Sequence, residues 1–130
     1  MANKVLTHLM FNGTAEEAMQ FYVSLLPDSK ITATEFFTEG EHEGMLQLGR
    51  FELGGREFIC INTLVEHDFD FTPSMSILVE FDSKAELEHC YAQLEDGGSV
   101  MMPLDDYGFS PLFGWVADRF GVSWQLNYIV

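Results

Sequence analysis

Lysine and arginine are scarce in this chain. Six basic residues stand against 21 acidic ones over 130 positions, which gives a formal net charge of −15. A surface of this sign repels the phosphates of nucleic acids and the headgroups of anionic membranes. The sequence therefore predicts neither kind of partner, and solubility is the role expected of most of the acidic residues.

Cysteine and long apolar runs are also scarce. The two thiols, Cys60 and Cys90, have no CxxC spacing, so reduced cysteines in the cytoplasm are the simplest interpretation. No segment approaches the roughly 18 consecutive apolar residues of a membrane span, and residues 1–11 lack the apolar core of a signal peptide. A cytoplasmic protein is expected, in which residues 1–130 form a single domain with an ordinary hydrophobic core.

One strand-to-helix pattern occurs twice in the sequence. Thr14 precedes Glu17, and Ser83 precedes Glu86, by the three positions of a helix-capping box. The shift of 69 positions that brings residue 14 onto residue 83 also superposes Tyr22 on Tyr91. Two copies of one supersecondary unit are therefore expected, with a shared cleft where the two halves meet.

Hydrophobic periodicity and turn residues divide the chain into two similar series of elements. Each series reads strand, helix, then three strands, with Gly54-Gly55 as a hairpin turn and Gly97-Gly98 as a helix stop. The predicted fold class is α+β, with βαβββ modules at 1–63 and 74–130 in a curved mixed sheet. The predicted strands are 5–11, 31–37, 45–51, 56–62, 75–81, 100–104, 113–117 and 123–130, and the predicted helices are 14–26 and 83–95.

Strand alternation assigns side chains to the two faces of the sheet. Trp124 and Leu126 are predicted to lie beneath the second helix, and Ile59 and Ile61 beneath the first. The opposite face mixes polar and apolar residues, as ligand pockets do. The ligand-binding residues predicted on that face are Thr7, Leu9, Phe58, Cys60, Asn62, Ser76, Gln125 and Asn127.

The chain resembles the vicinal oxygen chelate superfamily in two helix starts, FNGTAEEAMQFY and FDSKAELEHCY, and in its final DRFGVSWQLN. That superfamily includes glyoxalase I, bleomycin- and fosfomycin-resistance proteins and extradiol dioxygenases. The phrases LMFNGTAEEAMQFY, FTPSMSILVE and GWVADRFGVSWQLN are similar to its PhnB-like branch, sometimes labelled 3-demethylubiquinone methyltransferase-like. The resemblance covers nearly the whole chain and implies a glyoxalase/bleomycin-resistance-like fold. The reaction is left open, because one fold carries many chemistries.

The resemblance also indicates which positions would hold metal ligands. Metal enzymes of the superfamily take His or Glu ligands from the first and last strands of each module. Those positions fall here on Thr7, Ser76, Gln125 and either Cys60 or Asn62, with His8 on the opposite face. Neutral oxygen ligands hold a divalent cation weakly. No cofactor is therefore predicted, and a divalent metal is disfavoured.

The sequence supports two candidate functions. The first is a PhnB-like homodimer that binds a small organic molecule without metal, similar to the resistance proteins. The alternative is a metal-dependent lyase, isomerase or dioxygenase with atypical ligands. Methyl transfer from S-adenosylmethionine at a doubly wound site is unsupported, because the chain lacks G-x-G-x-x-G and Gly54-Gly55 joins two strands.

For other chemically reactive residues, a structural role is the alternative to a functional one. Glu80 alternates onto the cleft face and is a weak candidate for a general base, the alternative being an exposed carboxylate at a strand end. Cys60 is a candidate nucleophile, but no neighbouring His is predicted, which favours a small apolar filler. His42 and His67 lie in acidic loops and are expected to be solvated. The loop 105–112 is a candidate lid.

Overall fold

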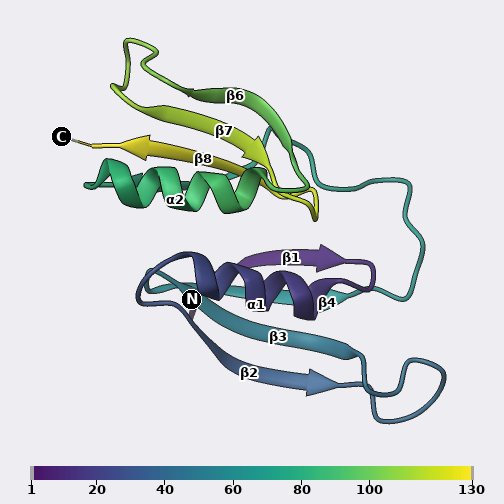
Figure 1. Ribbon diagram of the computed structural model, residues 1–130. Coiled ribbons are helices and arrows are strands. Elements are labelled where there is room, and N and C mark those ends of the chain that lie inside the picture. The colour runs from purple at the N-terminus through teal and green to yellow at the C-terminus, as the bar shows by residue number, and fades with distance from the viewer. Residues whose placement is uncertain (1, 130) are drawn as a thin grey trace. The chain divides into compact units, whose positions relative to one another are not determined.

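The computed structural model describes residues 2–129 of the chain. Its described residues divide into two compact units, 2–67 and 68–129, and each unit follows the order strand, helix and three strands (Figure 1). The α+β class and the duplicated βαβββ module predicted from the sequence are confirmed.

Each unit contains one four-stranded sheet. The first is composed of β1 (Thr7–Phe11), α1 (Ala15–Leu25), β2 (Lys30–Phe36), β3 (Leu46–Leu53) and β4 (Arg56–Asn62), with strand order β1-β4-β3-β2. The second is composed of β5 (Ser76–Phe81), α2 (Lys84–Glu95), β6 (Ser99–Asp105), β7 (Phe113–Ala117) and β8 (Ser123–Tyr128), with strand order β5-β8-β7-β6. In both sheets the first and last strands of the unit are parallel and the other pairs are antiparallel.

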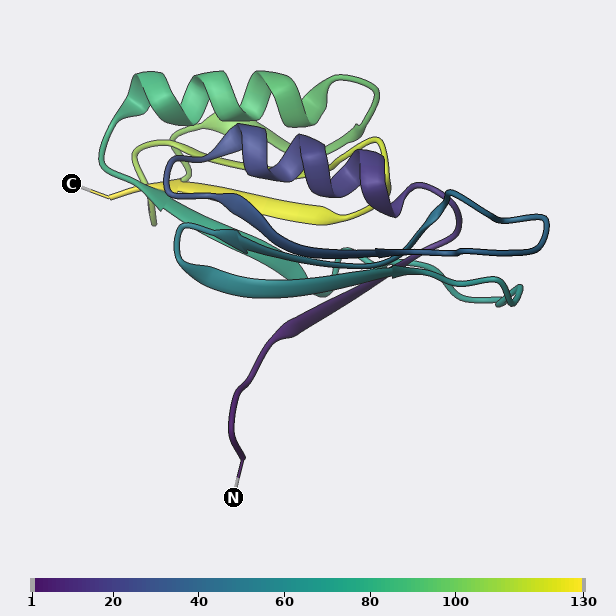
Figure 2. The ribbon, with the colours of Figure 1, turned by 90° about the horizontal axis from the view of Figure 1, so that it is seen from below.

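In each unit the helix covers one face of its own sheet (Figure 2). The buried face of α1 carries Ala18, Met19 and Tyr22, and the Tyr22 ring lies 6.3 Å from that of Phe51 on β3. A Cβ added at Gly49 would come within 2.5 Å of the Met19 sulfur, so glycine is what allows α1 to approach β3 this closely.

The second unit repeats this packing with different side chains. The buried face of α2 includes Tyr91 and Leu94, above Trp124 and Leu126 of β8. A Cβ at Gly114 of β7 would come within 2.8 Å of the Tyr91 ring. Tyr22 and Tyr91 thus have matching positions, which supports the duplication.

The two helix starts are built differently, although their sequences look alike. The Ser83 side chain accepts a hydrogen bond from the Glu86 backbone N–H at 3.2 Å, so the predicted cap of α2 is confirmed. The Thr14 side chain makes no capping hydrogen bond. Its place is taken by Asn62 at the end of β4, whose Oδ1 accepts from the backbone N–H groups of Gly13 and Ala15 at 2.9 and 3.0 Å.

No helix within residues 2–129 is both long enough and apolar enough to cross a membrane.

Candidate functional site

The residues predicted as ligand-binding in the first unit lie on the helix-covered side of the sheet. Phe58, Cys60 and Asn62 are 6%, 0% and 4% exposed beneath α1, and Leu9 is 7% exposed beside them. Their assignment to a ligand-facing side is therefore wrong. The alternation in β4 has the opposite sense, with Ile59 and Ile61 turned away from α1. Both alternating sets of β4 are largely apolar, so the pattern carried little information about which one faces the helix.

Asn62 and Cys60 have structural roles in this position. Besides holding the start of α1, Asn62 donates from Nδ2 to the Leu46 carbonyl at 2.9 Å. The Cys60 sulfur lies 3.9 Å from that of Met19. Burial raises the pKa of the Cys60 thiol to about 11, although a backbone hydrogen bond from Gly49 offsets part of the effect. This favours the apolar filler over the nucleophile.

A one-residue difference between the two units explains the error at Thr7. Phe11 and Phe81 are both buried at the end of the first strand, but Phe11 is three residues before the N-cap Thr14 and Phe81 two before the N-cap Ser83. The offset that matches residues of the two units is therefore one residue larger in the first strands than in the helices. An error of one residue in a strand assigns each side chain to the opposite face of the sheet. Thr7 pairs with Phe58 on the helix side of the first sheet, whereas His8, paired with Ile59, faces away from α1.

In the second unit the predicted burial of Trp124 and Leu126 beneath the helix is confirmed. Trp124 and Leu126 are fully buried beneath α2, and the alternate residues of β8 face the other way. We call this side of the β5-β8-β7-β6 sheet, the side away from α2, the far face. Cross-strand register arranges it in three rows, which are Ser76–Ser123–Ala117–Ser99, Leu78–Gln125–Trp115–Met102 and Glu80–Asn127–Phe113–Asp105.

Four side chains of the first two rows form a hydrogen-bonded chain. The indole Nε1–H of Trp115 donates to Ser123 Oγ at 2.8 Å, and Ser123 Oγ lies 2.7 Å from Ser76 Oγ. Gln125 Nε2 donates to the same Ser76 oxygen at 3.2 Å. The network brings together Ser76 and Gln125, two of the predicted ligand-binding residues, and adds Trp115 and Ser123, which sequence reasoning did not select.

Burial determines the direction of the shared proton in this network. Ser123 is 1% exposed, and Ser76 Oγ is the acceptor that lies within reach of its hydroxyl proton. A buried hydroxyl left without an acceptor is costly, so we assign Ser123 as the donor and Ser76 as the acceptor. Ser76 then accepts from both Ser123 and Gln125. The proton of the half-buried Ser76 hydroxyl remains available to a molecule on the far face.

The third row contains Phe113, which belongs to an aromatic cluster. Phe113 contacts Tyr107 and Phe109 edge-on, with ring centroids 6.1 and 5.0 Å apart, and the latter two rings stack at 6.0 Å. Beside Phe113 in the row, Asn127 has its Oδ1 buried with no hydrogen-bond partner. Glu80, next in the row, is exposed, so the buried general base considered from the sequence is not present and the exposed strand-end carboxylate is confirmed.

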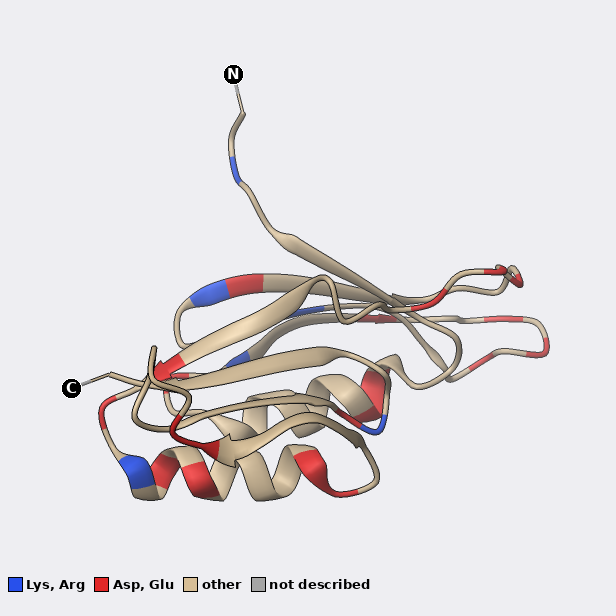
Figure 3. Cartoon of the chain, turned by 90° about the horizontal axis from the view of Figure 1, so that it is seen from above, with Lys and Arg blue, Asp and Glu red and all other residues tan. Residues whose placement is uncertain are grey.

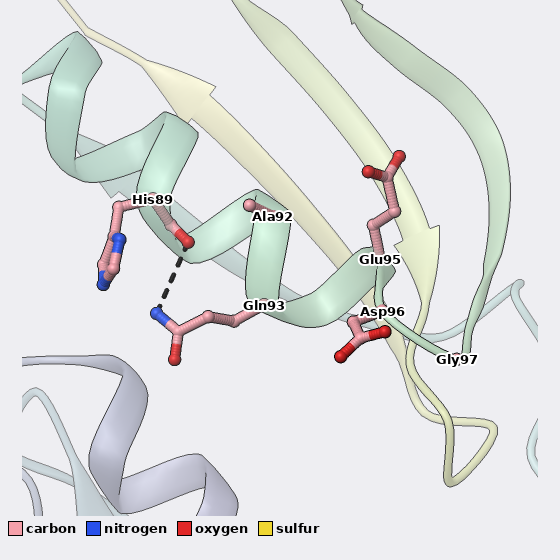
Figure 4. A pocket seen from close by; sticks show the side chains of 6 residues that line it. All are labelled: His89, Ala92, Gln93, Glu95, Asp96 and Gly97. Carbon is pink, nitrogen blue, oxygen red and sulfur yellow. Dashed lines mark hydrogen bonds between the residues drawn. The ribbon is translucent and has the colours of Figure 1, made fainter.

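A separate hollow of about 600 Å³ lies along the outer surface of α2 (Figure 4). Its lining is largely polar and exposed: His89, Ala92, Gln93, Glu95, Asp96 and Gly97. Gln93 Nε2 donates to the backbone carbonyl of His89 at 3.4 Å, an interaction within one helix. His89 is exposed, and this hollow has neither the apolar wall nor the converging polar groups of a ligand site.

Potential metal ligands are dispersed over the described chain. Within residues 2–129 no group of three or more His, Cys, Asp or Glu side chains is placed to hold a metal ion. His42 lies 3.3 Å from Glu41, and His67 lies 3.3 Å from the Thr63 hydroxyl. The two cysteines are free and buried.

The two βαβββ units define a protein of glyoxalase-like fold. More narrowly, the chain belongs to the 3-demethylubiquinone-9 3-methyltransferase family, whose sequence profile matches residues 3–127. It is 43% identical to a PhnB protein of Bacillus cereus that carries the same methyltransferase name, with a TM-score of 0.94 over 98% of this chain and 100% of that one.

Two further solved structures illustrate the range of the fold. Protein PA1353 from Pseudomonas aeruginosa is 28% identical, with a TM-score of 0.84 over 98% of each chain. A glyoxalase-related enzyme from Fulvimarina pelagi is 13% identical, with a TM-score of 0.60 over 98% of this chain and 89% of that one, and it shares the fold alone. No curated protein matches the sequence.

Proposed function

We propose that the protein binds a small organic molecule on the far face of the second unit, with Ser76 and Gln125 as the polar contacts. The observation that carries this proposal is the hydrogen-bond network, because with Ser123 assigned as the donor it leaves the Ser76 O–H without an internal acceptor. The Gln125 carboxamide oxygen is a neighbouring acceptor. A ligand group that both accepts and donates, such as an amide or an alcohol, matches this pair.

The surroundings of these groups favour a ligand with an apolar body. Leu78, beside Gln125 in the second row, is 58% exposed, and Trp115 lies on the other side of Gln125. Acidic residues occur along α2 and in the loops of the second unit (Figure 3), which makes an anionic ligand unfavourable. Of the residues nominated from the sequence, Ser76, Gln125 and Asn127 are retained in this proposal.

The methyltransferase name of the family is not carried over to this chain as an activity. The sheets are mixed, each has one helix on one face, and the glycine pair Gly54-Gly55 forms a hairpin turn with φ of 56° and 86°. A doubly wound site for S-adenosylmethionine needs a glycine-rich turn from a strand into a helix. We therefore place small-molecule binding ahead of methyl transfer.

A metal-dependent enzyme is the second candidate, and one observation favours it. His8 faces away from α1 and is exposed, so the first sheet presents an imidazole on the side that its helix leaves open. Elemental analysis of the untagged protein, with thermal shifts in Ni²⁺, Zn²⁺, Mn²⁺ and Fe²⁺, separates the two candidates. Near-stoichiometric metal that is lost in His8→Ala would place the enzyme first.

Binding itself is tested with benzamide, which offers one acceptor and one donor group on an apolar ring. In an NMR titration we expect shifts of the backbone amides of Ser76 and Gln125, and a severalfold weaker affinity for Ser76→Ala. Ser74→Ala is the matched control, since Ser74 is exposed and its hydroxyl contacts Thr72 at 2.8 Å. Equal weakening by both variants would contradict the proposal.

A further inference from the structure

The aromatic cluster at the end of the far face has one solvent-exposed ring. Phe109 is 69% exposed, although it stacks on Tyr107 and meets the edge of Phe113. A phenylalanine this exposed gains little from burial within the chain, so its contribution to folding is small. What it presents is the face of a π-system, which carries partial negative charge.

The loop that carries these rings is held by its own hydrogen bonds. The Tyr107 hydroxyl donates to the Pro103 carbonyl, and the Tyr107 backbone N–H donates to the Ser110 carbonyl at 3.1 Å. The Gly108 backbone N–H donates to Asp106 Oδ1 at 2.9 Å. A ligand would therefore meet an aromatic surface that is already arranged, which lowers the entropy cost of binding.

Two carboxylates and one unpartnered amide oxygen lie beside the rings. Glu80 and Asp105, both exposed, are at the two ends of the row that contains Phe113, and Asn127 Oδ1 in the same row has no donor. Lys84 and Arg119 are the Lys and Arg residues in the sequence of this unit, and their charges lie over the rings of Tyr128 and Phe120, at 5.4 and 4.6 Å. The row thus combines negative potential with aromatic faces.

We propose that this end of the far face, formed by Phe109, Tyr107 and the Glu80–Asp105 row, binds the ammonium group of an organic cation. The inference rests on the proposed function and specifies its ligand as an amine, protonated or quaternary, on an apolar body. Carboxylates attract such a cation over distance, and the aromatic faces stabilise it at contact through cation–π attraction. Ser76 and Gln125 then bind a neutral polar group elsewhere on the same molecule.

Three probes of one shape test the charge preference of the full chain. Benzylammonium, benzyl alcohol and benzoate are titrated at low ionic strength and followed by the backbone amide signals of residues 105–113 and of Asn127. We expect benzylammonium to bind about tenfold more tightly than benzyl alcohol. Benzoate is expected to bind more weakly than either, and roughly 0.5 M NaCl is expected to remove most of the advantage of the cation.

Two variants separate the aromatic contribution from the charge contribution. Phe109→Leu keeps an apolar side chain but removes the ring, so it should weaken the binding of benzylammonium severalfold and leave the binding of benzyl alcohol unchanged. Glu80→Gln should also weaken only the binding of the cation. The controls are Phe36→Leu, at another exposed phenylalanine, and Glu88→Gln, at an exposed carboxylate of α2. Circular dichroism confirms folding, which both test variants should keep because their side chains are exposed.

The outcomes distinguish this inference from the proposed function. If benzyl alcohol binds the far face as tightly as benzylammonium, or if Glu88→Gln weakens the cation as much as Glu80→Gln, the ammonium inference is overturned while binding on this face stands. If neither these probes nor benzamide shifts any far-face signal, both proposals fail. Shifts confined to α2 would show non-specific attraction to its carboxylates and would also overturn the inference.

Discussion

The indole Nε1–H of Trp124 donates to Oδ2 of Asp118 at 2.9 Å, across the turn between β7 and β8. The other carboxylate oxygen, Oδ1, accepts from the backbone N–H groups of Phe120 and Val122 at 2.9 and 3.1 Å. Asp118 is 3% exposed, and Trp124 is fully buried under α2. One buried carboxylate therefore joins the turn to the core of the second unit, in the hairpin whose register aligns Trp115 with Gln125.

Replacement of Asp118 tests this link. Asp118→Ala should lower the free energy of unfolding by about 2–4 kcal/mol, because it leaves three donors without this acceptor, two of them buried. Asp118→Asn should lose less stability than Asp118→Ala. Its amide oxygen still accepts from the turn, and only the hydrogen bond to the Trp124 N–H is lost, because an NH₂ group then faces that donor. Urea unfolding measures both variants, with exposed Asp82→Ala as the control. A loss below about 0.5 kcal/mol for Asp118→Ala would contradict the role of the carboxylate.

Asn62 is expected to matter for stability rather than for ligand binding. Asn62→Ala removes two acceptor contacts at the start of α1 and one donor contact to Leu46, and should cost about 2–4 kcal/mol. Asn12→Ala, at an exposed residue of the same β1–α1 connection, is the matched control. Denaturation of both in urea is the measurement. An Asn62→Ala protein with unchanged stability and weakened benzamide binding would restore the sequence-based assignment.

The two buried thiols make stability depend on alkaline pH. Burial raises the pKa of Cys60 to about 11 and that of Cys90 to about 12, from an ordinary value of 9.0. The native thiols therefore keep protons that the unfolded chain releases, so their contribution is complete below about pH 9 and falls as the pH rises toward about 11–12. In that window each thiol should lower the free energy of unfolding by about 1.4 kcal/mol per pH unit.

Urea unfolding under reducing conditions between about pH 8 and 10.5 measures this slope. Cys60→Ala and Cys90→Ala lower stability at every pH by leaving cavities, so the slopes are compared rather than the absolute values. Each variant should have a shallower decline above about pH 9. An unchanged slope in both would show that the thiols are accessible to water in the native state.

A homodimer is expected in solution. All seven residues of β2, an edge strand, are exposed, including Ile31 at 37% and Phe36 at 40%. Free edges with apolar side chains are usually covered by a partner. Light scattering at micromolar concentration should give twice the chain mass of 14.8 kDa. A monomeric mass would count against the expectation, and Ile31→Lys should shift the equilibrium toward monomer.

The fold was predictable because its signals are local. The helix stripes that contain Tyr22 and Tyr91, the Ser83 cap and the Gly54-Gly55 turn each depend on residues close together in the chain. The proposed site was only partly predictable. In β8 the contrast between Trp124 and Gln125 is strong enough to assign the faces, whereas in β4 the contrast between Ile59 and Cys60 is too weak.

The sequence by itself thus determined the duplicated βαβββ units, the buried faces of both helices and the polar face of β8, since periodicity and capping act over a few residues. Tertiary structure decided which face of β4 meets α1, because both of its faces are apolar and only packing against Met19 selects one. It also decided the one-residue difference between β1 and β5 and the meeting of Trp115 with Ser123. These depend on strand register, which long-range pairing sets and which no local pattern records.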